Sequence, residues 1–471
     1  MTEQSINLSL NGSQTHAACR ADTTVLEWLR AQKRMTGTKE GCAEGDCGAC
    51  SILVSKADGT GYFAANACIM AIGQVDGHSL ITIEGLSHGK AHPIQTAMAE
   101  NGSSQCGFCT PGIVVSLAGL LSTTLNPNEE EIHDALAGNL CRCTGYKPIV
   151  EAAKKVALGG MHGLTEKSEL RADLSEASKS EGSSFYRPKT LARLFALRKE
   201  HPSAQLLGGG TDMGVALAEH IIDWPVTIWT GAVKDLRDIR ENNFHWHFGS
   251  AVTWTEVLSK TASALPSLAT LLRRFGSTQI RNIGTIGGNI GTASPIGDGP
   301  PPLIALGASI TLASEFSERT IALEDFFLDF RKTELRPDEI IKSVSVPKPL
   351  PNQHFRVWKI SKRYDQDIST VCGAFNLTVK QGKIVSARVA FGGMAAIPRR
   401  AIEAEAALVG ITVKGGDFSI VSSAIRSAFN PLSDWRGTAD YRSEVAGNLA
   451  LRLGAELNGE TVDVMNLEGT L

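Results

Sequence analysis

A glycine-rich stretch with three cysteines, followed by a fourth cysteine, constrains this chain more than any other feature. Residues 41–50 read GCAEGDCGAC, and the next cysteine follows after a gap of 17 residues. Gaps of four and two residues between the first three cysteines, followed by a long gap before the fourth, are those of the plant-type ligand set for a two-iron, two-sulfur cluster. The glycines suit a loop around a cluster, because glycine accepts positive φ and leaves backbone N–H groups free to face sulfur. The predicted ligands are Cys42, Cys47, Cys50 and Cys68.

A second cysteine set follows, with a different spacing. A C-x2-C pair and a C-x-C pair are separated by 31 residues. The second pair is one residue too close for a zinc ribbon, although zinc remains the alternative for this set alone. Beside a ferredoxin-like loop, we predict a second iron–sulfur cluster, held between four short helices near residues 93–100, 113–121, 128–137 and 148–158. Its predicted ligands are Cys106, Cys109, Cys141 and Cys143.

Length and composition favour a multidomain chain that binds metal rather than forming disulfides. The 471 residues suggest three or four domains. The net charge of −3 gives no general basic field for nucleic acid or an anionic membrane. Met1 to Ser5 lack a secretory signal pattern, and no stretch approaches the roughly 20 apolar residues of a membrane span. We therefore expect a cytoplasmic protein, in which clustered cysteines bind metal. Cys19 and Cys372, outside both ligand sets, are expected to be small buried apolar residues.

Two glycine-rich segments point to a bound dinucleotide. Residues 206–212 read LLGGGTD after a predicted strand, and residues 281–298 are rich in glycine and small polar residues. Glycine turns expose backbone N–H groups that can hold a phosphate, and two such loops could clamp one dinucleotide from both sides. Neither segment is the G-x-G-x-x-G fingerprint of Rossmann folds. Two tight turns in an α/β core remain the alternative.

The motifs together resemble the molybdenum hydroxylases, and particularly the xanthine dehydrogenases among them. The similarity covers essentially the whole chain and includes long matches: GTKEGC at 37–42, QCGFCTPG at 105–112, NLCRCTGY at 139–146 and GGNI at 287–290. The resemblance implies an α+β multidomain fold. Its expected parts are a β-grasp ferredoxin domain (1–86), a four-helix cluster domain (87–160), a linker (161–184), a two-part α/β FAD-binding domain of the vanillyl-alcohol-oxidase type (185–350) and a C-terminal α+β domain (351–471).

The resemblance also assigns flavin-binding residues. Phe275 matches an aromatic residue that stacks on the flavin ring, although it could equally be an apolar residue ending a helix. Lys359 and Asp367 match charged residues beside the ring, for which a solvated face is the alternative. The full implied FAD set is Leu206, Leu207, Gly208, Gly209, Gly210, Thr211, Asp212, Met213, Phe275, Thr285, Ile286, Gly287, Gly288, Asn289, Ser294, Asp298, Lys359 and Asp367.

The implied activity is electron transfer from a molybdenum centre to NAD. Relatives hydroxylate xanthine or hypoxanthine to urate at a molybdopterin cofactor. Here the chain stops at Leu471, so the resemblance implies that the molybdopterin cofactor lies on a separate large subunit. The two kinds of subunit would form a dimer of heterodimers. Electrons would pass through the Cys106-containing cluster, the Cys42-containing cluster and FAD to NAD, with no catalytic residue in this chain. Gln105 matches a residue facing the pterin, although it could be a polar residue at a helix end.

Three other functions share some or all of these motifs. A molybdenum hydroxylase acting on an aldehyde, an N-heterocycle or an aromatic thioester would have the same small subunit, because the partner selects the substrate. A free-standing iron–sulfur flavoprotein would need no molybdenum partner. A zinc-bound scaffold would be colourless, whereas clusters and flavin absorb visible light.

Overall fold

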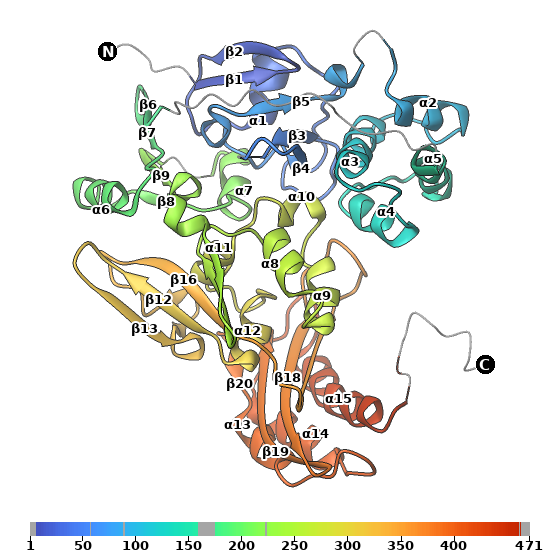
Figure 1. Cartoon of the computed structure of the whole chain (residues 1–471), viewed down its shortest axis with the longest axis vertical. Coiled ribbons are helices and arrows are strands. Elements are labelled where there is room, and N and C mark those ends of the chain that lie inside the picture. The colour runs from blue at the N-terminus through green and yellow to red at the C-terminus, as the bar shows by residue number, and fades with distance from the viewer. Residues whose placement is uncertain are drawn as a thin grey trace. The chain divides into compact units, whose positions relative to one another are not determined.

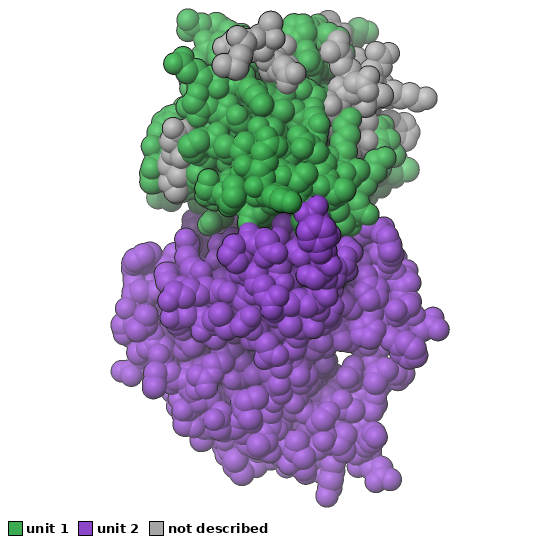
Figure 2. Space-filling model, turned by 90° about the vertical axis from the view of Figure 1, so that its left-hand side faces the viewer, with its two compact units in different colours: residues 1–237, 251–256, 273–288 green, residues 238–250, 257–272, 289–471 purple. Residues whose placement is uncertain are grey.

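A computed structural model describes residues 6–56, 58–87, 90–158, 175–221, 224–460 and 462. Met1 to Ser5, in which no secretory signal is predicted, lie outside these ranges. Residues 161–174 of the predicted linker also lie outside them. Figure 1 shows the elements, and Figure 2 colours two compact units that are described separately. The first unit comprises residues 1–237, 251–256 and 273–288, and the second comprises residues 238–250, 257–272 and 289–471.

A five-stranded sheet carries the first cysteine set in the first unit. Its strand order is β2-β1-β5-β3-β4, with β1 and β5 parallel. Strands β1 and β2 form a hairpin whose turn residues Asn11 and Gly12 have φ of 52° and 81°. Thr24 caps the first helix by accepting a hydrogen bond from the Glu27 N–H at 3.1 Å, as its sequence predicts. The elements are β1 Ile6–Leu10, β2 Ser13–Ala17, α1 Val25–Glu27, β3 Ser51–Ser55, β4 Tyr62–Asn66 and β5 Ser79–Ile81.

Four helices follow and carry the second cysteine set. Their apolar residues form one core with residues of β3 and β4. Pro93 and Pro111 stand at helix starts, where a missing N–H removes no intrahelical bond. The predicted four-helix arrangement is therefore present, with bounds α2 Pro93–Glu100, α3 Thr110–Thr123, α4 Glu129–Leu136 and α5 Lys147–Leu158.

A mostly parallel four-stranded sheet completes the main elements of the first unit. Its order is β6-β7-β9-β8, and β9 pairs in parallel with both β7 and β8. The predicted linker 161–184 is too long at its C-terminal end, because a β6–β7 hairpin turning at Gly182 lies partly within it. Its serine-rich sequence resembles a linker, yet pairing with β9 makes it a sheet. The elements are β6 Ala177–Ser180, β7 Ser183–Tyr186, α6 Leu191–Glu200, β8 Gln205–Leu207, α7 Met213–Ala218, β9 Val226–Trp229 and α10 Thr278–Arg281.

An antiparallel sheet in the second unit has the order β10-β11-β16-β12-β13. Its strands are β10 Ile239–Glu241, β11 His245–Gly249, β12 Ser309–Ala313, β13 Glu318–Ala322 and β16 Ile340–Pro347. A small hairpin, β14 Phe327–Asp329 and β15 Lys332–Thr333, precedes β16. The chain between β11 and β12 also forms α8 Trp254–Thr261, α9 Pro266–Arg273, α11 Ile286–Gly291 and α12 Pro300–Leu306, the first three of which have residues in both units.

The C-terminal region forms an antiparallel sheet packed on helices, as its sequence predicts. The strands run in the order β17-β18-β19-β20, and their buried side chains share one core with the last three helices. The bounds are β17 Gln353–Ile360, β18 Val371–Lys380, β19 Lys383–Gly392, β20 Arg399–Arg400, α13 Ile402–Leu408, α14 Ser419–Ala428 and α15 Ala439–Leu457. Among the described residues, we find no helix with the length and apolar character needed to cross a membrane.

Candidate functional site

The first cysteine set lies in a loop that folds around sulfur. The N–H groups of Glu44, Asp46 and Cys47 donate to Cys42 Sγ at 3.5, 3.3 and 3.3 Å. Cys50 Sγ and Cys68 Sγ lie 3.3 Å apart in the buried side of the loop. Positive φ values at residues 43, 45 and 48 produce this curvature, and glycine occupies the last two positions. The folded loop therefore brings the predicted ligands of the first cysteine set together.

The chemistry of this loop fits a cluster. The thiols of Cys47 and Cys68, together with backbone N–H groups, hold the pKa of Cys42 below its usual range, and their contacts with Cys42 raise the pKa of Cys47 and of Cys68. Thiolate is the form that ligates metal. A Cβ at Gly41 would lie 2.7 Å from Cys47 Sγ, so glycine leaves space beside the sulfur. Among the residues the model describes, no three His, Cys, Asp or Glu side chains surround one metal-ion position. A two-iron cluster needs no such group, because each iron takes only two of the four thiolates.

The second cysteine set is more exposed, and its side chains interact in pairs. Cys106 interacts with Cys143, and Cys109 with Cys141. The backbone N–H of Phe108 and the thiol of Cys143 hold the pKa of Cys106 below its usual range. Gln105 is exposed and donates through Nε2 to the Cys143 carbonyl at 3.0 Å. Two cysteine pairs suit a cluster in which each iron takes two thiolates. The role of Gln105 toward a pterin stays a prediction.

Direct hydrogen bonds connect the two cysteine loops. The Leu140 N–H donates to the Cys47 carbonyl at 3.0 Å. Asn139 Nδ2 donates to the next carbonyl, that of Gly48, at 3.1 Å. A Cβ at Gly112, at the start of α3, would lie 2.2 Å from that same oxygen, so the backbones are in close contact. The two predicted ligand sets are therefore neighbours within the first unit.

The two glycine segments also meet within the first unit. A Cβ at Gly209 would lie 1.9 Å from the Ile283 carbonyl oxygen, and one at Gly208 would lie 2.9 Å from Thr285 Oγ1. Trp229 Nε1 donates to the Gly208 carbonyl at 3.1 Å, which fixes the turn after β8. Backbone at this spacing leaves no room for side chains and can approach a phosphate closely. The two segments therefore lie side by side, an arrangement in which both could contact one dinucleotide.

Gly209→Ala should separate the two glycine segments. A methyl group 1.9 Å from a backbone oxygen cannot be accommodated without moving one segment, at a cost of about 1–3 kcal/mol. We expect the purified variant to lose FAD, measured by flavin fluorescence after denaturation. Gly291→Ala is the matched control, because a Cβ there would meet only Ile341 Cδ1, at 3.4 Å. Full FAD content in Gly209→Ala would contradict the clamp.

The remaining predicted flavin residues of the second unit include a buried ion pair. Lys359 Nζ lies 2.8 Å from Asp298 Oδ2, and both side chains are at most 8% exposed. Ser369 Oγ donates to Asp298 Oδ1 at 2.5 Å. Asp367 does not join this group: its carboxylate accepts from the N–H groups of Arg363 and Ile368 in its own loop. Sequence reasoning missed Ser369, since a single serine in a loop has no distinguishing signal.

Two further observations concern predicted flavin residues. Asn289 Oδ1 is buried, and among the described residues it has no hydrogen-bond partner, as expected of a group that a ligand would satisfy. In the first unit, Phe275 is half-buried and packs on Trp254 with ring centroids 4.8 Å apart. A buried tryptophan thus supports the Phe275 ring. Such support would be needed for Phe275 to hold a stacked flavin ring in place.

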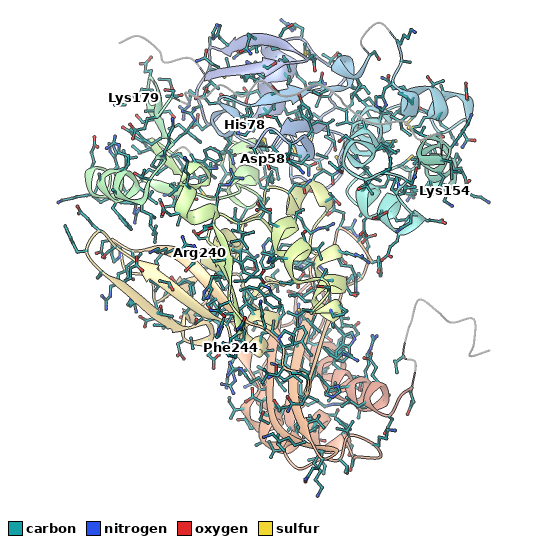
Figure 3. The ribbon with its side chains drawn as sticks, viewed as in Figure 1. Asp58, His78, Lys154, Lys179, Arg240 and Phe244 are labelled. Atoms are coloured by element: carbon teal, nitrogen blue, oxygen red, sulfur yellow. The ribbon has the colours of Figure 1, made fainter. Side chains whose placement is uncertain are left out.

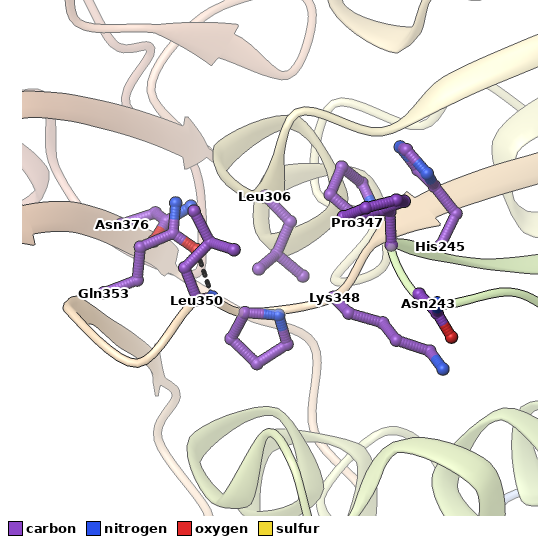
Figure 4. A pocket seen from close by; sticks show the side chains of 10 residues that line it. Asn243, His245, Leu306, Pro347, Lys348, Leu350, Gln353 and Asn376 are labelled. Carbon is purple, nitrogen blue, oxygen red and sulfur yellow. Dashed lines mark hydrogen bonds between the residues drawn. The ribbon is translucent and has the colours of Figure 1, made fainter.

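A small pocket in the second unit lies apart from the predicted site residues. Its volume is about 220 Å³, below the roughly 300 Å³ at which ligand pockets begin. Figure 4 shows Lys348 and Asn243 at one end and Asn376 at the other, and Figure 3 labels the exposed Phe244 on its rim. None of the predicted cluster or flavin residues lines it. The cysteine loops and glycine segments therefore remain the candidate site.

Comparison with known families agrees with this division of the chain. Residues 8–72 match a 2Fe-2S iron–sulfur cluster binding domain, and residues 82–154 match a second 2Fe-2S binding domain. Residues 178–349 match the FAD binding domain in molybdopterin dehydrogenase, and residues 356–457 match the CO dehydrogenase flavoprotein C-terminal domain. The predicted order of α+β domains is confirmed, and the chain has two cluster-binding domains and a flavin-binding domain.

Individual relatives extend the comparison. Xanthine dehydrogenase of Drosophila subobscura is 34% identical over 444 residues, which cover 79% of this chain and 33% of that protein. The chain thus spans about a third of the length of the curated relatives it matches. A carbon monoxide dehydrogenase structure from Hydrogenophaga pseudoflava is 28% identical, with a TM-score of 0.54, covering 57% of this chain and 94% of that chain. A quinoline 2-oxidoreductase structure from Pseudomonas putida 86 is 25% identical, with a TM-score of 0.53, covering 58% and 96%.

Proposed function

Because this chain carries the iron–sulfur and FAD portion of the molybdenum hydroxylase family, we propose that it is the electron-transfer subunit of a xanthine dehydrogenase. Electrons would enter from a molybdenum cofactor on a separate large subunit and leave to NAD. Sequence similarity favours xanthine or hypoxanthine as the substrate, since the curated relative described above is a xanthine dehydrogenase. A molybdenum-containing partner is supported by the carbon monoxide dehydrogenase structure described above, whose name includes a molybdenum cofactor.

The residues of this chain would bind and position the cofactors. The Cys42 and Cys106 sets would each hold one cluster, and the two glycine segments would hold FAD. When bound, iron–sulfur clusters carry single electrons and a flavin exchanges hydride, so together they connect a metal centre to a nicotinamide. The chain would supply orientation, exclusion of water and hydrogen bonds to sulfur, all of which tune such groups.

The hydrogen bond between the cysteine loops is the observation that carries this proposal. The Leu140 N–H bonds to the carbonyl of Cys47, and Leu140 immediately precedes Cys141. A predicted ligand of one cluster is therefore joined to a predicted ligand of the other by one hydrogen bond and a few covalent bonds. Such proximity is what stepwise electron transfer between two clusters requires. Two independent structural metal sites would have no need of it.

An assay of the complex purified from its natural source tests the substrate and the acceptor. We expect xanthine and NAD to yield urate and NADH, followed by absorbance, together with co-purification of a larger chain that contains molybdenum. Carbon monoxide, an aldehyde and quinoline serve as comparison substrates. Turnover of one of these without urate formation would contradict the xanthine assignment, and an active flavoprotein lacking both molybdenum and a large chain would contradict the subunit assignment.

A further inference from the structure

A buried amide joins the flavin-binding domain to the helical cluster domain within the first unit. Gln279, in α10, is 0% exposed. Its Nε2 donates to Asn139 Oδ1 at 2.8 Å and to Ser116 Oγ at 2.9 Å. Asn139 stands two residues before Cys141, and Ser116 lies in the helix that follows Cys109. One side chain thus bonds to both segments that carry the second cysteine set.

The same network continues to the first cysteine set. Asn139 Nδ2 donates to the Gly48 carbonyl at 3.1 Å, and Ser51 Oγ donates to that carbonyl at 2.8 Å. Ser116 Oγ also donates to Ser51 Oγ, at 3.4 Å. Gly48 lies between two predicted cluster ligands. The four side chains of Ser51, Ser116, Asn139 and Gln279, which we call the amide junction, therefore connect three domains.

Close packing reinforces the amide junction. A Cβ at Gly138 would lie 2.4 Å from Ser277 Cβ and 2.3 Å from Gln279 Oε1, so glycine is required for α10 to approach. On either side of Gln279, Thr278 Oγ1 donates to the Asp134 carbonyl at 2.8 Å, and Asn282 Nδ2 donates to the Ala64 carbonyl at 2.9 Å. The short helix α10, which begins three residues after Phe275, is therefore fixed at several points.

We propose that the Gln279 carboxamide is a positioning residue for electron transfer, because it fixes residues 273–282, including Phe275, against both cysteine loops. Gln279 Oε1 is buried and has no hydrogen-bond partner among the described residues, so the two bonds donated by Nε2 are what hold the side chain in place. Moving Gln279 would leave its buried Nε2 and the acceptors on Ser116 and Asn139 without these bonds, which is costly in a buried site. Electron tunnelling slows steeply as donor and acceptor separate, so a relaxed junction would slow transfer while leaving the cofactors bound. This inference rests on the proposed function, because it requires clusters and FAD in the chain.

Gln279→Leu in the complete complex tests the proposal. The flavin is reduced by a light flash with a photoreductant, and its reoxidation is followed together with cluster absorbance, so that neither xanthine nor NAD is needed. We expect intramolecular transfer to slow several-fold, because tunnelling falls off exponentially as donor and acceptor separate. The spin–spin splitting between the reduced clusters should also change. Gln14→Leu, on an exposed strand position of the same unit, should leave the rate and the splitting unchanged.

Ser116→Ala is a milder variant that keeps the test decisive if Gln279→Leu does not fold. It removes one acceptor of the Gln279 amide and should slow transfer by a smaller factor. Normal transfer rates in either variant, with full iron and FAD content, would overturn the role of Gln279. Absence of iron or FAD from the wild-type protein would instead overturn the proposed function, so the two failures are distinguishable.

Discussion

Cys47→Ala should remove one cluster and stop electron flow between the second cluster and FAD. Alanine cannot ligate iron, and changes outside the ligand set of a metal site already cost about 10- to 100-fold in affinity, so loss of a ligand should exceed this. Iron should fall from about four atoms to about two per chain. Iron analysis and electron paramagnetic resonance of the dithionite-reduced variant check the result, since only the signal of the Cys106-containing cluster should remain.

Cys19→Ala is the matched control for this experiment. Cys19 is half-buried in the same domain but lies outside both predicted ligand sets. Its replacement should leave the iron content, both paramagnetic signals and electron transfer to the flavin unchanged. If Cys47→Ala kept the iron and signals of the wild type while Cys19→Ala lost them, the ligand assignment would be wrong.

Lys359→Met should destabilise the second unit by about 3–5 kcal/mol, because it leaves the buried Asp298 carboxylate without its cation. The hydrogen bond from Ser369 would remain, yet a hydroxyl cannot neutralise the charge. We also expect weaker FAD retention, since Lys359 and Asp298 both belong to the predicted flavin set. Urea unfolding, compared with the wild type at the same pH, measures the loss of free energy.

Two further variants separate the buried charge from other effects of this change. Lys154→Met breaks a solvent-exposed pair with Glu129 (Lys154 is labelled in Figure 3) and should cost far less, because an exposed ion pair contributes little to stability. Lys359→Met combined with Asp298→Leu replaces the whole buried pair with apolar side chains and should recover most of the lost stability. A double variant no more stable than Lys359→Met would show that the unpaired charge is not the cause.

Local sequence signals predicted the elements that depend on local interactions. Asn11-Gly12 specifies a hairpin because both residues adopt positive φ, and the structure shows this turn. The final helix, α15, begins after Thr438, which caps its first turn by accepting a hydrogen bond from the Tyr441 N–H at 3.1 Å. The cysteine spacings likewise identified both loops that the structure folds around sulfur.

The sequence was less informative where partners lie far apart along the chain. Gln279 meets Asn139 across 140 residues, and Lys359 meets Asp298 across 61. Nothing in the neighbouring residues of Gln279 or Ser369 indicates such partners. The β6 strand was missed for the same reason, since its serine-rich segment becomes a strand only through the sheet that β7 and β9 extend. Tertiary pairing overrides local composition at these positions.

Cofactor analysis of the purified wild-type chain tests the central claim most directly. Iron, acid-labile sulfide and FAD are quantified per chain, and the partially reduced protein is examined by electron paramagnetic resonance. We predict about four iron atoms, equal sulfide and one FAD per chain, with two distinct 2Fe–2S signals. A colourless protein containing zinc in place of iron, or a protein with one cluster signal, would contradict it.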